Sequence, residues 1–222
     1  MSLCVAKLGG SLAGSPLLGA WLDAFAAWRT PLIVVPGGGR FARDVRADQL
    51  REGFSDAEAH RRALRAMERF GAVLAGHSAR FVPAALRGDI AGALEAGKIP
   101  VWLPSVMALA APDIPASWDM TSDSLAAWLA GACGATRLLL LKSCDVAAPV
   151  SVRALAAQGI VDPLFAHFSA RSGAAVYVAG PAALADAGAV VRQGGVPGVA
   201  VSRLDRGAKS CSSVKFKPIA IA

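Results

Sequence analysis

Short apolar runs alternate with longer helical patterns along the chain, and this alternation constrains the fold more than any other feature. Each run is rich in Val, Ile, Leu or Ala and ends at a turn former such as Gly, Pro or Ser. Repeated strand and helix units of this kind predict an α/β fold around a mostly parallel sheet. The expected strands lie at residues 3–8, 31–36, 99–104, 137–142, 174–179 and 197–202. The expected helices lie at residues 15–28, 40–51, 83–96, 121–132, 149–157 and 181–192, and one more begins at Ser55.

The helix that begins at Ser55 has the clearest signals. Ser55 and Glu58 form a capping box, in which each side chain reaches the backbone at the other position. Apolar residues then recur at spacings of three and four, so one face is expected to pack on the sheet. The apolar positions are Ala59, Ala63, Met67, Phe70 and Leu74, and the opposite face is expected to carry His60, Arg61, Arg65 and Arg69.

The composition indicates one compact domain over residues 1–222. The chain is 55% hydrophobic and 18% charged, which excludes a disordered or fibrous protein. Its 23 Lys and Arg against 16 Asp and Glu give a net charge of +7, which leaves a nucleic-acid partner, an anionic substrate or a general arginine bias as explanations. The basic residues are dispersed and no nucleic-acid module is recognisable, so we expect no nucleic-acid partner.

Cysteine usage and hydropathy predict a cytoplasmic protein. The cysteines at positions 4, 133, 144 and 211 form no C-x-x-C pair and are expected to be free thiols in a reducing compartment. The N-terminus goes straight into a predicted strand, without a basic region and a cleavable apolar stretch. The longest uncharged stretch, residues 99–112, is too short for a bilayer and contains prolines, so we expect no membrane partner.

Two glycine-rich turns follow the first two predicted strands. The first is KLGGS, in which Lys7 is one of only six lysines among the 23 basic residues, and a lysine supplies a compact, mobile charge. The second is PGGG, where Gly37 to Gly39 allow close backbone approach to an anion before a helix start. A plain strand-to-helix turn is the alternative for the second motif. The PGGG motif with Ala42 also matches the dinucleotide-binding pattern G-x-G-x-x-A. In that pattern an acidic residue ends a strand about 20 positions later, whereas here the acidic residues lie at the start of a helix, so the match to a dinucleotide site is weak.

Two further motifs carry charge at predicted element ends. In TSD, Thr121 and Ser122 are good N-caps and Asp123 suits the first helical turn, so a purely structural role is open beside a catalytic one. In LLLLKSCD, an apolar strand ends at Lys142 and Asp145 follows. Ligands of open α/β folds bind at the carboxyl ends of the strands, which is where both lysines are expected. The P-loop pattern G-x-x-x-x-G-K-[ST] is absent from the chain.

The order K-x-G-G-S, P-G-G-G, T-S-D and K-S-x-D resembles the amino acid kinase family, which includes acetylglutamate, uridylate, carbamate and isopentenyl phosphate kinases. The resemblance covers about residues 3–150. It implies a three-layer αβα sandwich with a central sheet of about eight mostly parallel strands. It further implies that an acceptor-binding part, about residues 1–135, precedes a nucleotide-side part, about residues 136–222.

The resemblance implies a cytoplasmic, ATP-dependent phosphotransferase that acts on a small anionic acceptor. Mg²⁺ would be held mainly by phosphate oxygens and water, without a dedicated metal site. Two segments, DAEAHRRALRAMERFGAVLAG and WDMTSDSLAAWLA, are most similar to kinases of methanofuran-type cofactor synthesis, which convert a furan-methyl phosphate to its diphosphate. The family also implies a homo-oligomer, a dimer or a hexamer. An acyl-phosphate-forming kinase and a non-catalytic nucleotide-binding or storage protein of the same fold remain as alternatives.

Matching positions carry the family's roles over to this chain. Lys7 would contact the transferring phosphate, Asp123 would position the lysines, and Lys142 would be a second catalytic cation, for which Lys209, Lys215 and Lys217 are alternatives. His60 has a structural or solvent-facing alternative. The nucleotide-side residues would be Gly9, Gly10, Ser11 and Asp145. The acceptor-side residues would be Gly37, Gly38, Gly39, Arg40, His60, Thr121 and Ser122. One departure is that the loop after Asp145 lacks the Asp-Gly pair of many relatives.

Overall fold

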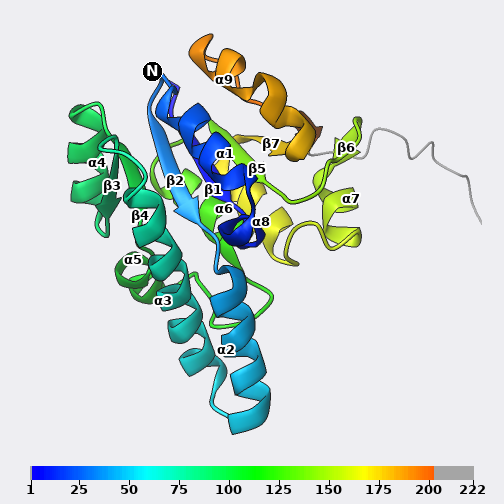
Figure 1. The fold of residues 1–222 in the computed structure, drawn as a ribbon. Coiled ribbons are helices and arrows are strands. Elements are labelled where there is room, and N and C mark those ends of the chain that lie inside the picture. The colour runs from blue at the N-terminus through cyan, green and yellow to red at the C-terminus, as the bar shows by residue number, and fades with distance from the viewer. Residues whose placement is uncertain (1, 203–222) are drawn as a thin grey trace, which may run out of the picture.

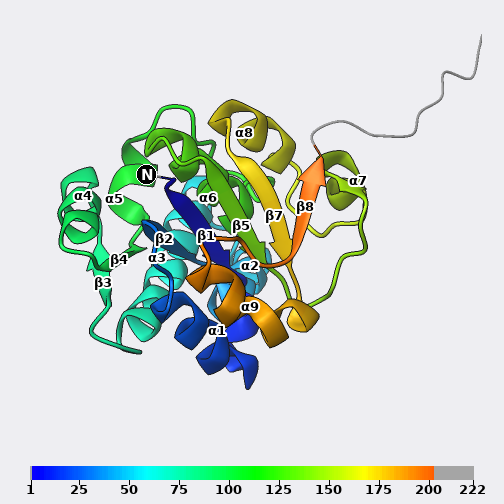
Figure 2. The same ribbon diagram turned by 90° about the horizontal axis from the view of Figure 1, so that it is seen from above.

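A computed structural model describes residues 2–202 of the chain, and these residues form an eight-stranded sheet covered by helices on both faces (Figures 1 and 2). The strand order is β3-β4-β2-β1-β5-β7-β8-β6. Neighbouring strands are parallel except β7 and β8, which pair antiparallel. This confirms the α/β fold with a mostly parallel sheet. The strands are β1 (Cys4–Leu8), β2 (Leu32–Pro36), β3 (Phe81–Ala84), β4 (Ile99–Trp102), β5 (Arg137–Leu141), β6 (Val150–Ser151), β7 (Ala175–Ala179) and β8 (Val199–Ser202).

Seven of the α-helices in residues 2–202 lie where a helix was predicted, although their bounds differ by a few residues. Short 3-10 turns lie at η1 (Gly10–Gly14) and η2 (Pro181–Ala183). The remaining helices are α1 (Leu17–Ala26), α2 (Gly39–Glu52), α3 (Asp56–Ala75), α4 (Arg87–Glu95), α5 (Ser105–Ala110), α6 (Ser122–Ala132), α7 (Val152–Ala157), α8 (Phe165–Ser172) and α9 (Leu184–Arg192).

The central strand β1 has two differently occupied faces. Cys4, Ala6 and Leu8 pack into one apolar cluster with α1 and α9, while Val5 belongs to the cluster on the α6 and α8 side. Because side chains alternate along a strand, Lys7 faces the same side as Val5. Figure 2 shows α1 and α9 on one face of the sheet and α6 and α8 on the other. The side chain of Lys7 therefore lies between the sheet and α6.

Several elements were not expected from the sequence. Strand β3 lies where the beginning of a helix at residues 83–96 was predicted, and β6 occupies the start of the helix predicted at 149–157. Helices α5 and α8 were not predicted at all. Pro83 and the two-residue length of β6 weaken the strand signal in both places. The antiparallel direction of β8 could not be read either, because alternation gives a strand's faces but not its direction.

Helix α3 begins as predicted, with the Ser55 hydroxyl accepting a hydrogen bond from the Glu58 N–H at 3.3 Å. One expectation for this helix is wrong: His60 does not lie on the open face with the arginines but is 8% exposed. The reason is that α2 packs along this side of α3. Figure 1 shows α2 and the first part of α3 reaching beyond the strands as a helical hairpin.

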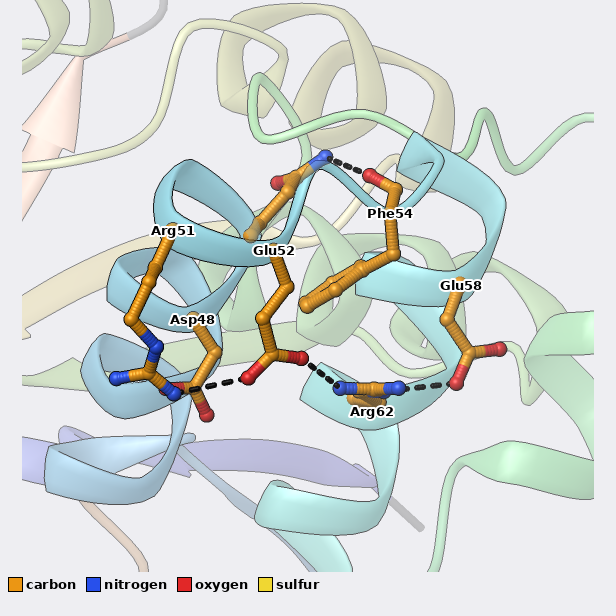
Figure 3. A network of polar contacts seen from close by, with 7 residues as sticks. Asp48, Arg51, Glu52, Phe54, Glu58 and Arg62 are labelled. Carbon is orange, nitrogen blue, oxygen red and sulfur yellow. Dashed lines mark hydrogen bonds and ion pairs between the residues drawn. The ribbon is translucent and has the colours of Figure 1, made fainter.

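The tip of this hairpin is held by polar contacts (Figure 3). Arg62 lies between Glu52 of α2 and Glu58 of its own helix, at 3.7 and 2.7 Å. The Arg62 guanidinium also covers the Phe54 ring, 4.1 Å from its centroid. These contacts join the end of α2 to the start of α3.

In residues 2–202 there is no helix with the length and apolar character that a bilayer crossing demands.

Candidate active site

The two lysines and the two glycine turns singled out in the sequence lie at the carboxyl ends of three neighbouring parallel strands. Lys7 lies near the end of β1, Gly37 follows β2, and Lys142 follows β5. Strand β1 is paired with β2 on one side and with β5 on the other, in register along all five residues. The three strand ends are therefore side by side, at the edge where open α/β sheets bind ligands.

A buried cluster of two lysines and one aspartate forms the centre of this edge. The Lys7 ammonium is 2.9 Å from Oδ1 of Asp123, and the Lys142 ammonium is 2.6 Å from Oδ2. The side chains of Lys7, Asp123 and Lys142 are 7%, 6% and 12% exposed. Asp123 reaches both lysines because it lies in the first turn of α6, which packs against β1.

The charges of this cluster perturb one another. Burial by itself raises the pKa of Asp123, but the charges of Lys7 and Lys142 outweigh this effect and leave the pKa below its ordinary value. The pKa of Lys142 is lowered, first by burial and then by the neighbouring positive charge of Lys7, although Asp123 and Asp162 act in the opposite direction. Two cations held on one carboxylate leave positive charge available for a ligand that carries negative charge.

The two glycine turns touch each other through their backbones. A side-chain carbon placed on Gly10 would lie 1.9 Å from the Gly39 nitrogen, and one on Gly37 would lie 2.3 Å from the Gly10 nitrogen. Gly39 has φ +56°, a conformation that glycine adopts without strain. The second turn leads directly into α2, which begins at Gly39. Gly10, Gly37 and Gly39 are thus required by the close packing of the two turns, and Gly39 also by its own backbone conformation.

A second aspartate, Asp162, supports the helix turn that carries Asp123. Its Oδ2 accepts hydrogen bonds from the Thr121 N–H at 3.0 Å, the Thr121 hydroxyl at 2.7 Å and the Ser124 N–H at 3.1 Å. Its Oδ1 accepts from the Ser124 hydroxyl. Thr121 is the N-cap residue of α6 but its side chain does not cap the helix, because its hydroxyl is donated to Asp162 instead.

A largely apolar cavity of about 190 Å³ adjoins the cluster. It lies between α2, α3 and the segment that leads into α6. Its rim includes Trp118, whose indole N–H donates to the Gln49 side chain at 2.6 Å and whose ring lies under the Arg46 guanidinium at 4.5 Å. The apolar lining comes from Ala42, Ala59, Ala63, Leu64, Met67, Met120 and Leu125, and the polar lining from Arg43, Arg46, Asp56, His60, Ser117, Thr121 and Ser122.

The cavity collects some of the predicted acceptor-side residues but not others. Gly38, His60, Thr121 and Ser122 line it. Burial lowers the pKa of His60, and Nε2 of its ring has no hydrogen-bond partner among residues 2–202. Gly37 and Gly39 lie in the adjoining turn rather than in the cavity wall. Arg40 is exposed, and its guanidinium lies over the ring of its neighbour Phe41 at 5.0 Å.

The predicted nucleotide-side residues lie along the same strand edge. The Gly9 N–H donates to the Leu141 carbonyl at 3.2 Å, which places the first glycine turn next to the end of β5, while Ser11 in η1 is exposed. Asp145 is exposed as well and accepts from the Ala182 N–H at 3.0 Å, so it joins the loop after β5 to η2. Lys209, Lys215 and Lys217, the alternatives to Lys142, lie outside the described residues.

The described residues contain no group of three or more His, Cys, Asp or Glu side chains placed to hold a metal ion. Both oxygens of Asp123 are directed at lysines.

Two parts of the site were not predicted from the sequence. Asp162 had no recognisable motif, because its partners are about 40 positions away and only the fold brings them together. The lining residues Asp56 and Trp118 were also missed, although the first residue of the helix that follows Ser55 and a tryptophan just before TSD gave some signal.

Comparison with known proteins agrees with this geometry. The sequence profile of the amino acid kinase family matches residues 2–146, well over half of the chain. A [5-(aminomethyl)furan-3-yl]methyl phosphate kinase from Methanocaldococcus jannaschii is 31% identical over 129 residues. The match covers 56% of this chain and 58% of that relative, so this chain aligns with less than two thirds of that protein's length.

Solved structures share the fold at low sequence identity. The uridylate kinase from Archaeoglobus fulgidus superimposes with a TM-score of 0.65 at 18% identity, covering 91% of this chain and 100% of that one. The UMP kinase from Bacillus anthracis gives a TM-score of 0.66 at 15% identity, with 91% and 96% coverage. The four motifs, the eight-stranded sheet and the family profile agree, and the chain belongs to the amino acid kinase family.

Proposed function

We propose that the protein transfers the γ-phosphoryl group of ATP to a small acceptor that already carries an anionic group. The observation that carries this proposal is the buried Lys7–Asp123–Lys142 cluster at the strand edge, beside two contacting glycine turns. Phosphoryl transfer needs mainly positioning and stabilisation of charge on the phosphate oxygens, and this arrangement supplies both.

In this mechanism each group has a separate task. Lys7 and Lys142 stabilise charge on the phosphoryl oxygens as the bond to ADP breaks and the bond to the acceptor forms. Asp123 keeps both ammonium groups in place. N–H groups of the glycine turns other than those of Gly9 and Gly37, which donate to strand carbonyls, contact phosphate oxygens. A magnesium ion that arrives with ATP would neutralise further phosphate charge. An acceptor phosphate is acidic enough to react without a strong general base.

The acceptor we propose is a compact ring carrying a phosphomethyl group, of the kind named for the M. jannaschii relative. The cavity is small, with about 190 Å³, and its apolar lining consists of Ala, Leu and Met side chains. Drug-sized ligands occupy pockets of roughly 300 Å³ or more, so the dimensions favour a small ring over a whole nucleotide. Thr121, Ser122 and Gly38 would face the phosphate end, and Asp56 at the rim offers a carboxylate to an amine.

An acceptor screen coupled to ADP release tests the proposal. The acceptors would be [5-(aminomethyl)furan-3-yl]methyl phosphate, the same compound without its aminomethyl group, UMP and acetylglutamate. We expect ADP release with the furan phosphates and formation of a diphosphate visible by ³¹P NMR. Transfer to UMP alone would contradict the proposed acceptor class. ATP binding in calorimetry without transfer to any of the four acceptors would contradict the proposed catalysis and favour a nucleotide-binding protein.

A further inference from the structure

Asp162 is a buried carboxylate that none of the sequence motifs includes. It lies in the segment between α7 and α8 and is 8% exposed. All four of its side-chain hydrogen bonds go to two residues, Thr121 and Ser124, which flank Ser122 and Asp123 at the start of α6. A backbone hydrogen bond from the Leu164 N–H to the Asp119 carbonyl, at 3.1 Å, joins the same two segments.

We propose that Asp162 is a positioning residue for phosphoryl transfer, because it fixes the first turn of α6 and thereby holds Asp123 between the two lysines. This inference rests on the proposed function of the lysine pair. Asp123 must offer Oδ1 to Lys7 and Oδ2 to Lys142 at the same time. A small rotation of the helix turn would break one of these ion pairs, and Asp162 binds the residues immediately before and after the pair Ser122 and Asp123.

The charge of Asp162 contributes as well as its hydrogen bonds. The net positive charge of two lysines and Asp123 is available to a phosphate only while both buried ammonium groups stay protonated. Asp162 acts on Lys142 through its charge, in the direction that favours the protonated ammonium. A negative charge at the N-terminus of α6 is also stabilised by the N–H groups of the first helical turn, of which that of Ser124 donates to Asp162. The same carboxylate therefore sets both the geometry and the charge of the cluster.

Another capping aspartate provides a matched control. Asp89 accepts hydrogen bonds from the backbone N–H groups of Ala85 and Leu86, at 3.0 and 2.9 Å, at the start of α4. It has the same residue type and likewise accepts from backbone N–H groups at a helix start, but it is exposed, and α4 packs against β3 and β4 rather than against the strands that carry the site. A variant of Asp89 measures what the loss of a helix cap does by itself.

The test compares Asp162→Ala with Asp89→Ala by steady-state kinetics and thermal unfolding. We expect both variants to unfold at lower temperature than the wild type. Only Asp162→Ala should lose activity, with kcat reduced about 100-fold because the reacting groups are misplaced, while KM for ATP changes by less than about threefold. A folded Asp162→Ala variant with a kcat within about threefold of the wild type would show a purely structural cap and overturn the inference.

A second variant keeps the test decisive if Asp162→Ala does not fold. Asp162→Asn can retain the four contacts, because its amide oxygen can replace Oδ2 and the Ser124 hydroxyl can accept from its NH₂ group, but the charge is lost. The pKa of Lys142, followed by ¹³C NMR of the six labelled lysines and assigned with Lys142→Arg, should then be lower than in the wild type. An unchanged Lys142 pKa together with an unchanged kcat would overturn the inference.

The NMR measurement separates this inference from the proposed function. If the wild type transfers no phosphoryl group to any acceptor, the proposed function fails. In that case a lower pKa of Lys142 in Asp162→Asn still supports the placement of Asp162 as an organiser of the cluster, and an unchanged pKa rejects it.

Discussion

Lys7, Asp123 and Lys142 illustrate how a few buried charges are arranged to bind another charge. An aspartate paired with one lysine would be neutral, but here one carboxylate holds two ammonium groups and both of its oxygens are used. The two lysines repel each other, and Asp123 is what keeps them together. The three residues therefore differ in what their removal does to stability.

Replacing Asp123 by Asn should destabilise the protein strongly. The substitution leaves Lys7 and Lys142 buried side by side without the carboxylate that pairs with them, and breaking a buried ion pair in this way costs about 3–5 kcal/mol. Urea unfolding measures this free energy. Asp145→Asn is a suitable control, because Asp145 is exposed and makes a single hydrogen bond to Ala182. Equal unfolding free energies for the two variants would contradict the claim that Asp123 pairs with two buried lysines.

The lowered pKa of Lys142 predicts a loss of activity at alkaline pH. Phosphoryl transfer needs the charged ammonium, so kcat should fall as the pH passes the pKa of Lys142 in the folded protein, which lies below the ordinary value of 10.5. The effect of this group on the stability of the fold has the opposite pH dependence. Between the two pKa values the unfolded chain binds the proton that the folded protein has lost, so this group makes folding more favourable as pH rises.

Lys142→Arg checks the assignment of this alkaline limb, because arginine stays charged throughout the range. A pH profile of kcat should show the limb in the wild type and its displacement to higher pH in the variant, whatever the absolute rate. An alkaline limb at the same pH in both proteins would assign it to another group.

Among the elements, the contact between the two glycine turns is the most sensitive to substitution. Gly10→Ala would bring a methyl group to within 2.2 Å of the Gly39 Cα and force the turns apart. Overpacking of this kind costs about 1–3 kcal/mol, and a displaced turn should lower kcat about 100-fold. Gly14→Ala is the matched control, since it lies in the same 3-10 turn and has no atom within 4 Å of the added carbon. Equal kcat in the two variants, measured by ADP release, would argue against a shared phosphate cradle.

Elements also show where sequence reasoning succeeds. The strand–glycine–helix order predicted that Lys7 and Lys142 lie at the same sheet edge, because each lies at the end of a parallel strand and the carboxyl ends of neighbouring parallel strands lie at one edge.

The burial of His60 could not be predicted, since it depends on how α2 packs against α3. Asp162 is a similar case. A single aspartate before a proline has no periodicity or motif, and its role depends on a contact across about 40 residues.

At the scale of the whole molecule, the strand order explains why the site is central. Strand β1 lies between β2 and β5, so the first lysine, both glycine turns and the second lysine meet in the middle of the sheet edge. The mostly parallel sheet was readable from alternation, and the family motifs implied its eight strands. The position of the short strands β3 and β6 depended on pairing with distant strands and was not readable.

The central claim is that Lys7 acts on the phosphoryl group during transfer. The most direct test is the rate of phosphoryl transfer from ATP to the furan-methyl phosphate by the wild type and by Lys7→Ala. Removing Lys7 relieves its repulsion with Lys142 and leaves Asp123 paired, so the thermal midpoint should change little. We predict that kcat falls about 10²–10³-fold, the usual effect of deleting one group that stabilises transition-state charge. Equal rates in the two proteins would contradict the account.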